Sequence, residues 1–190
     1  MEIVKSQNSK IIKYFLVVFI GSILLAISSK IKIPFYPVPM TMQTFVVLFL
    51  GLAFGYKIGL ATVSLYLLEG IFGLPVFSNS PEKGVGLIYF TGPTMGYLVG
   101  FLLAVCSAGI LKDLINFKNY KYINILSVFS GLVISVSFIY ILGLLWLGYL
   151  IGWDKPIFKL GAQPFLLAEF FKILLLTALY PWIKKLNKII

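Results

Sequence analysis

Glu169 and Lys172 are the side chains whose types and spacing most clearly suggest chemistry. They are three residues apart, so on a helix they share one face and can form an ion pair. A helix that begins at Pro164 places them roughly 7 and 12 Å along its axis, inside an apolar slab. Charged groups at this depth usually face a cavity or a partner, which predicts a binding role. A purely structural ion pair, or a Lys172 that reaches toward the membrane surface, is the alternative.

Four further polar side chains extend this hypothesis. Gln43, near the start of one predicted helix, and Glu69, near the end of another, are expected to point into the same crevice. The alternatives are that Gln43 caps its helix and that Glu69 meets an interfacial lysine. Asn79 and Lys83 belong to a glycine- and proline-rich loop, residues 73–97. A polar, turn-rich insert is costly inside a bilayer, so we expect this loop at a membrane face, as part of a small-molecule site rather than as ordinary solvated chain.

Aromatic residues make up 16% of the chain, and most are expected in interfacial belts or in packing. Several nevertheless lie in or beside the predicted loops of one face: Phe35, Tyr36, Phe77, Tyr89, Tyr149 and Trp153. A cavity with aromatic walls, a few amide or carboxylate groups and one or two lysines suits a small, partly apolar, anionic metabolite. It does not suit a sugar or a bare ion.

The elements that must position these side chains are membrane helices. The chain has 190 residues, of which 60% are hydrophobic and 12% charged, with a mean hydropathy of +1.01. This composition is typical of an integral membrane protein. Apolar runs of roughly 20 residues predict membrane crossings, and turn signals divide the chain into one all-α domain with six transmembrane helices, at residues 11–29, 42–56, 57–72, 93–111, 122–150 and 164–183.

The lysines predict how this bundle is oriented. The net charge of +10 comes from 16 lysines and no arginine, and the lack of the forked guanidinium disfavours nucleic-acid binding. Ten lysines lie in the two termini and in the turns near residue 57 and at residues 112–121, against five in the other three loops. We therefore expect a multi-pass protein of the cell membrane with both termini cytoplasmic, in contact with anionic lipid, and with the three proline- and aromatic-rich loops at the outer face.

Missing residue types exclude several classes of chemistry. The sequence has no histidine, and its single cysteine, Cys106, lies among aliphatic residues. Histidine-ligated metals, histidine-based acid–base catalysis and cysteine clusters are therefore excluded, and we expect neither a metal nor a cofactor. A small lipid enzyme with Glu169 or Glu69 as general base would lack a nucleophile. A purely structural subunit, without a saturable ligand, is a further alternative.

The first predicted helix carries small residues at helical spacing. Ser22 and Ala26 are four apart, with Gly21 beside them, and such a face lets a second helix approach closely. It fits packing inside the protein as well as docking of a partner.

Four sequence blocks carry a resemblance to a known family. The blocks are IPFYPVPMTMQT at residues 33–44, YLLEGIFGLPVF at 66–77, GPTMGYLVGF at 92–101 and PFLLAEFFK at 164–172. They resemble the signature blocks of the BioY family, the biotin-binding substrate (S) components of energy-coupling factor (ECF) transporters. The resemblance implies a six-helix S-component bundle with biotin near the outer face. It also implies a membrane-embedded partner with two cytoplasmic ATPases, since the chain itself has no Walker-type motif for hydrolysing ATP. Uptake by the protein acting alone is the alternative.

The resemblance also implies roles for particular residues. Asn79, Lys83, Glu169 and Lys172 become the best binding candidates, and the face of Ser22 and Ala26 corresponds to the docking motif for the transmembrane partner. Glu169 stands where the family pattern has an aspartate, and Met95 where glycine is more usual.

The chemistry of biotin agrees with these residue types. Its ureido group offers two N–H donors and one carbonyl, which match Glu169, Asn79 and Lys172. The valerate carboxylate would pair with Lys83, and the sulfur-containing ring would pack against Tyr89 and Phe35. An S component for another vitamin, such as thiamine or riboflavin, is the nearest alternative.

Overall fold

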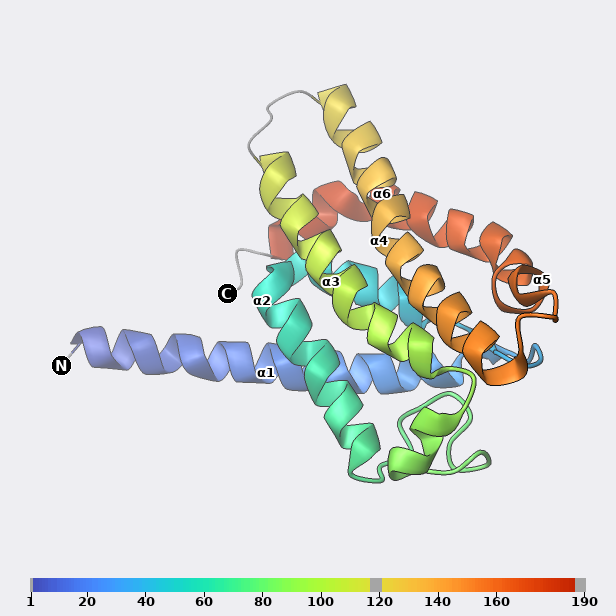
Figure 1. The fold of residues 1–190 in the computed structure, drawn as a ribbon. Coiled ribbons are helices and arrows are strands. Elements are labelled where there is room, and N and C mark those ends of the chain that lie inside the picture. The colour runs from blue at the N-terminus through green and yellow to red at the C-terminus, as the bar shows by residue number, and fades with distance from the viewer. Residues whose placement is uncertain (1, 117–120, 187–190) are drawn as a thin grey trace.

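Long apolar helices form most of the molecule (Figure 1). The computed structural model describes residues 2–116 and 121–186. Its elements are α1 (Glu2–Lys30), β1 (Lys32–Ile33), β2 (Met40–Thr41), α2 (Gln43–Ile71), the 3-10 helix η1 (Gly86–Thr91), α3 (Met95–Asn116), α4 (Lys121–Ile151), α5 (Ile157–Gly161), the 3-10 helix η2 (Gln163–Phe165) and α6 (Leu166–Leu186). Within these described residues, five helical segments are long and apolar enough to cross a membrane.

A sharp bend at Gly55 divides α2 into two arms, which explains why five segments are counted where six were predicted. Gly55 has φ 81° and ψ 174°, a conformation that is essentially restricted to glycine. The arms correspond to the predicted helices 42–56 and 57–72. They meet at this one residue instead of at the predicted turn of residues 55–57. The all-α bundle and its six helical arms are thus as predicted.

Glycines bring α3 close to its neighbours. A Cβ placed on Gly100 would lie 2.6 Å from Ile139 Cα of α4, and one on Gly96 would meet the carbonyl of Leu142. Gly109 packs in the same way against the bend of α2 at Tyr56. These three close approaches make α3 the central helix between α2 and α4.

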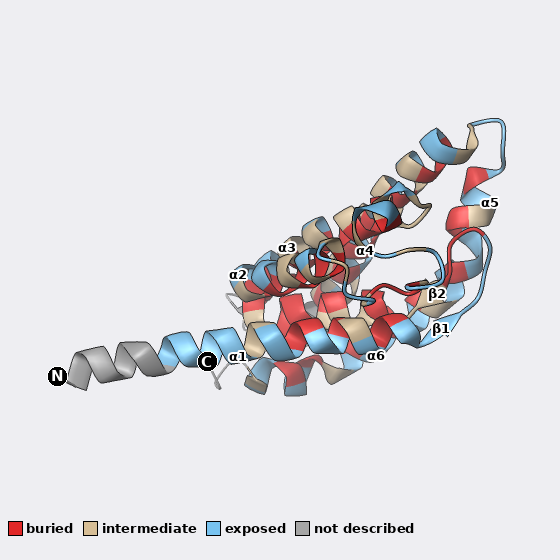
Figure 2. Cartoon of the chain, turned by 90° about the horizontal axis from the view of Figure 1, so that it is seen from below, coloured by how far each residue is buried: buried red, intermediate tan, exposed pale blue. Residues whose placement is uncertain are grey.

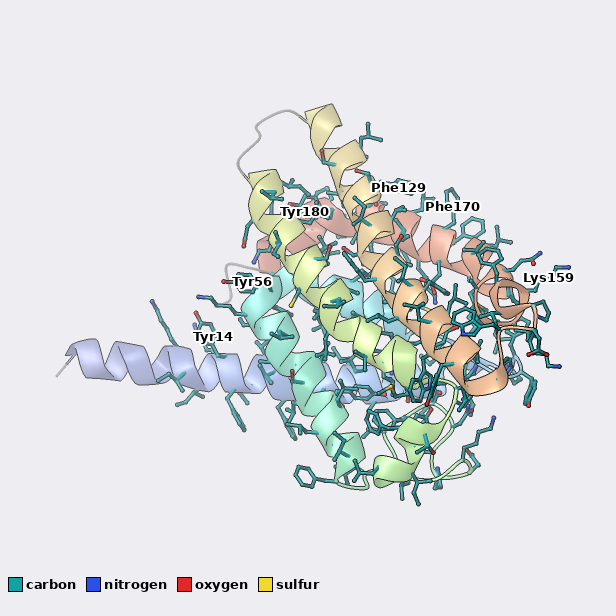
Figure 3. The ribbon with its side chains drawn as sticks, in the orientation of Figure 1. Tyr14, Tyr56, Phe129, Lys159, Phe170 and Tyr180 are labelled. Carbon is teal, nitrogen blue, oxygen red and sulfur yellow. The ribbon has the colours of Figure 1, made fainter. Side chains whose placement is uncertain are left out.

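Burial follows the inner faces of the helices, while the outer faces remain apolar (Figure 2). Phe15 and Ile20 of α1 and Leu126 and Ile134 of α4 are all more than half exposed. A contiguous apolar exterior of this kind belongs in lipid rather than in water. The chain is therefore a multi-pass membrane protein. On the far side of the bundle α6 packs beside α4, where the rings of Phe129 and Phe170 lie 6.1 Å apart (Figure 3).

Three connections gather at one end of the bundle, which we call the loop end. They are residues 31–42, 72–94 and 152–165, and direct contacts join them. Lys32 Nζ donates to the carbonyl of Ser78 at 2.6 Å, and the rings of Phe35 and Phe165 meet edge-on at 5.7 Å. The gathering of these loops at one end is the arrangement that the predicted topology requires.

The loops contain more regular structure than predicted. The proline-rich segment folds back on itself, so that β1 and β2 pair antiparallel with Lys32 opposite Thr41. The loop before the last helix contains the short α5, and η2 forms where Pro164 was expected to open that helix, so α6 begins at Leu166. Short 3-10 turns at helix starts are common, and proline fits the first turn of either helix type.

Candidate small-molecule binding site

A cavity lies among the helices near the loop end. The empty space within it, counted together with its opening, is about 530 Å³. The first arm of α2 and the proline-rich segment line one side, and α3, α4 and α6 line the others. The lining residues are Val38, Pro39, Met40, Thr41, Gln43, Thr44, Ser78, Tyr89, Thr94, Tyr97, Leu98, Phe101, Ile139, Tyr140, Phe165 and Glu169.

Glu169 and Lys172 form a buried ion pair on α6, as their spacing predicted. Lys172 Nζ lies 2.8 Å from Glu169 Oε1, and the two side chains are 8% and 5% exposed. The ammonium group also donates to the carbonyl of Thr41 at 2.7 Å and to Thr44 Oγ1 at 2.9 Å, and Thr44 in turn donates to Glu169 Oε1 at 2.9 Å. The alternative of a Lys172 that points toward the membrane surface is wrong.

The two members of this pair differ in what they offer to a ligand. An ammonium group has three N–H donors, and Lys172 uses them on Thr41, Thr44 and Glu169. It lies behind the cavity and not among its lining residues. Glu169 lines the cavity beside the side chain of Tyr140, and its second oxygen, Oε2, is buried and makes no hydrogen bond of acceptable geometry with the described residues. A buried carboxylate oxygen without a donor is costly, so this atom is where an N–H group of a ligand would be most favourable.

Gln43 also lies in the cavity, as predicted. Its Nε2 donates to the hydroxyl of Tyr66 at 2.7 Å, and Tyr66 donates to the carbonyl of Val76 at 3.1 Å. The amide is therefore fixed in orientation between the first arm of α2 and the loop that follows the second arm. Gln43 is the first residue of α2, but its side chain belongs to this network and does not cap the helix.

Aromatic rings form one wall. Tyr89, predicted to bind ligand, is 4% exposed, stacks on Phe77 with ring centroids 4.6 Å apart, and shares a hydrogen bond of 3.1 Å with Ser78 Oγ. Tyr97 donates to the carbonyl of Gly161 at 2.8 Å, which ties α3 to the segment before α6. These side chains give the cavity rigid, largely apolar faces with a few hydroxyl groups.

Two predicted loop residues lie outside the cavity lining. Asn79 Oδ1 accepts a hydrogen bond from Lys32 Nζ at 3.1 Å. Lys83 is exposed, with its ammonium group 5.9 Å from the centre of the Tyr36 ring. The reason is that the loop turns at residues 79–84 and directs these side chains toward the surface, while Ser78 points inward.

Two predicted aromatic residues also face outward. Phe35 is 39% exposed and packs against Phe165, which is the ring that reaches the cavity. Tyr149 is 77% exposed and lies against Trp146 near the end of α4. The positions of these two residues beside the loops predicted that they lie at the loop end. They did not predict whether each side chain faces the cavity or the outside.

Glu69, Ser22 and Ala26 belong to the contact between α1 and α2. Ser22 Oγ is buried and donates to Glu69 Oε1 at 2.8 Å, so Glu69 does not face the cavity. Ser22 is therefore not available on the surface as a docking residue, and Ala26 is partly buried against the core. This corrects the docking assignment of Ser22 in favour of the alternative, internal packing.

Several lining residues were missed by the sequence analysis: Thr44, Ser78, Thr94, Tyr97, Phe101, Tyr140 and Phe165. Five of them lie inside the four quoted sequence blocks, which was the only available signal: Thr44, Thr94, Tyr97, Phe101 and Phe165. Tyr140 is a tyrosine in the middle of a long apolar helix, but with 11 tyrosines in the chain its type alone does not mark it.

Several known proteins are similar to this chain over most of its length. The sequence profile described as the BioY family matches residues 4–188. A relative from Thermotoga maritima named "Biotin transporter BioY" is 34% identical over 164 residues, covering 86% of this chain and 91% of the relative. A "Probable biotin transporter BioY" from Pyrococcus horikoshii is 31% identical over 149 residues, covering 78% and 82%. Another protein of that name, from Rickettsia prowazekii, is 29% identical over 183 residues, covering 96% and 89%.

A solved structure shares the fold. It is described as the S-component for biotin from an ECF-type ABC transporter, and it aligns with a TM-score of 0.74 and 23% sequence identity. The alignment covers 94% of this chain and 93% of that one. The predicted S-component fold is confirmed.

Proposed function

The chain belongs to the BioY family, and from this premise we propose that it takes up biotin across a membrane by binding it in the cavity beside Glu169. The observation that carries the proposal is Glu169 Oε2, a buried acceptor without a donor at the wall of an aromatic-lined cavity. The relatives carry the names of transporters, and we place this chain in the same class rather than among enzymes.

The ureido group of biotin matches the polar side of the cavity. One ureido N–H donates to Glu169 Oε2, whose orientation is fixed because Oε1 is held by Lys172 and Thr44. The amide of Gln43 has two N–H groups and uses one on Tyr66, so the other can donate to the ureido carbonyl. Lys172 acts on biotin only through Glu169, because its three donors are already used.

The sulfur-containing ring matches the apolar side. Tyr89, Tyr97 and Phe101 provide buried aromatic surface within the same cavity. Among the described lining residues there is no lysine, so the valerate carboxylate does not find Lys83 in this arrangement. We infer that the valerate chain extends toward the loop end, where Lys32 and Lys83 are exposed.

The membrane orientation and the energy source belong to the same proposal. We infer that both termini are cytoplasmic in the cell membrane, because ten lysines lie on that side of the predicted topology against five on the other. The chain has no Walker-type motif, so we infer that energy comes from a separate transmembrane subunit with two cytoplasmic ATPases, as the family resemblance implies. The solved neighbour is described as a component of an ECF-type ABC transporter. Uptake by a host lacking every energy-coupling subunit would instead indicate solitary transport.

Titration of the detergent-solubilised protein tests the ligand. We expect saturable binding of biotin and much weaker binding of thiamine and riboflavin. In Glu169→Gln, the amide oxygen is expected to keep the contact with Lys172, which turns an NH₂ group toward the ureido N–H. Two facing donors should weaken biotin binding by about 10- to 100-fold, the usual worth of a charge-assisted hydrogen bond.

Asp154→Asn is the matched control, because Asp154 is an exposed acid at the loop end, paired with Lys155. It should bind biotin as the wild type does. Wild-type affinity in Glu169→Gln would reject the proposed contact, and tighter binding of another vitamin would reject biotin as the ligand.

A further inference from the structure

Lys30, the last residue of α1, and Lys32, the first residue of β1, hold the segment of residues 77–80. Lys30 Nζ donates to the carbonyl of Phe77 at 2.7 Å and to the carbonyl of Ser80 at 2.9 Å. Lys32 Nζ donates to the carbonyl of Ser78 at 2.6 Å and to Asn79 Oδ1 at 3.1 Å. Every residue from 77 to 80 thus accepts a bond from one of two ammonium groups, an arrangement that we call the lysine clamp.

The clamped segment is part of the cavity wall. Ser78 lines the cavity directly and shares a hydrogen bond with Tyr89, while Phe77 is 1% exposed and stacks on the Tyr89 ring. Tyr89 itself lines the cavity. The position of residues 77 and 78 therefore decides where the hydroxyl and the ring of Tyr89 lie.

Lysine is suited to this task because its ammonium group is a compact charge with three donors in different directions. Charge-assisted bonds to carbonyl oxygens are about twice as strong as neutral ones. The segment has turns but little other regular structure, and the clamp fixes it from outside the cavity. Ser29, in the last turn of α1, adds a further hydrogen bond, from its Oγ to the carbonyl of Val76 at 2.7 Å.

The clamp also joins the cavity wall to a helix that otherwise packs mainly on α2. α1 contributes no side chain to the described cavity lining, yet its last turn holds the loop that does. A displacement of this end of α1 would therefore move Phe77, Ser78 and Tyr89 together.

We propose that Lys30 and Lys32 are positioning residues for ligand retention: they hold residues 77–80 so that Ser78 and Tyr89 close one wall around the bound molecule. The inference depends on the proposed function, since biotin is the ligand that would be retained. It predicts that loss of the clamp acts on the dissociation rate more than on the association rate.

The experiment uses the full chain with Lys30→Met and Lys32→Met together, which keep the apolar stems and remove the charges. Biotin dissociation is expected to become about tenfold faster or more, on the scale of losing charge-assisted hydrogen bonds, with the association rate changed less than about threefold. Replacing the Lys30→Met change of this double variant by Lys30→Arg should recover part of the slow dissociation. The reason is that a guanidinium group can also donate to both carbonyls.

Lys159→Met is the matched control, because Lys159 is an exposed lysine on α5 that points away from the bundle (Figure 3). It should leave both rates unchanged. Unchanged dissociation in the double variant, or an equal effect in the control, would overturn the clamp.

Hydrogen exchange of the ligand-free protein separates this inference from the proposed function. The amides of Ser80 and Lys83 bond to the carbonyls of Phe77 and Asn79 within the segment. Their exchange should become at least about tenfold faster in the double variant, while amides in α3 are unaffected. If the wild type failed to bind biotin, the proposed function would fall, yet faster local exchange would still support the clamp. Unchanged exchange would contradict it whatever the ligand.

Discussion

Glu169 and Lys172 have different roles at the cavity, because Glu169 lines it and Lys172 lies behind it. The spacing of Glu169 and Lys172 predicts that they meet, because residues three apart share a helix face. Which of them touches the cavity depends on Thr41 and Thr44, more than 120 positions away, which take up the donors of Lys172. Glu69 has no such local partner: its contact, Ser22, lies 47 residues earlier, so its place outside the cavity could not be predicted.

The buried pair makes a prediction about stability. Lys172→Met leaves the Glu169 carboxylate buried without its counter-charge, which should cost about 3–5 kcal/mol of unfolding free energy. Adding Glu169→Leu removes the remaining charge. Because apolar replacements of a buried ion pair are often neutral or stabilising, the double variant should recover most of the stability without recovering biotin binding.

Unfolding in detergent, followed by circular dichroism, and biotin titration would measure the two effects on the same samples. A double variant that still binds biotin with wild-type affinity would remove Glu169 from the site. A double variant less stable than Lys172→Met alone would show that the charges serve the fold more than the ligand.

At the scale of elements, the length of the apolar runs predicts the long helices. The structure of the segments that connect them depends on tertiary contacts. The predicted helix 122–150 falls within α4, whereas the predicted helix 93–111 begins before α3 begins and ends before α3 ends. The pairing of β1 with β2, and the short α5, have too few residues to give a periodic signal. The bend of α2 was predicted as a turn because glycine and lysine follow an apolar run, yet only the backbone angles of Gly55 show that no loop is needed.

Gly55 is the element-scale position most open to test. Alanine is disfavoured at φ 81° and ψ 174°, and its Cβ would also lie 3.3 Å from Lys112 Nζ. Gly55→Ala should therefore lower the unfolding free energy by about 1–3 kcal/mol. Gly73→Ala is a useful comparison, because Gly73 also has a positive φ but its Cβ would meet nothing within 4 Å. Thermal unfolding of the two variants would measure the difference, and a Gly55→Ala protein as stable as the wild type would contradict the role of the bend.

At the scale of the whole molecule, the sequence predicts a membrane bundle but not the cavity. Hydropathy and the scarcity of charge imply lipid-facing surfaces, and the exposed apolar side chains of α1 and α4 agree. The cavity draws residues from position 38 to position 169, and they come from α2, α3, α4, η2, α6 and two of the loops. Which residues meet at the cavity depends on the angles at which the helices cross and on the close approach of α3 at Gly96 and Gly100. No local sequence pattern specifies this geometry.

The orientation of the bundle in the membrane is a property of the whole molecule that can be tested. In a Cys106→Ser background, Asp154→Cys places a thiol at the exposed loop end, and Lys57→Cys places one beside the bend of α2 at the opposite end. Because most lysines outside the membrane cluster with the termini and the bend, the positive-inside rule puts that end in the cytoplasm. A membrane-impermeant maleimide should label Asp154→Cys on intact cells and Lys57→Cys only after permeabilisation. The reverse pattern would place the cavity toward the cytoplasm, where it could release biotin but not capture it from outside.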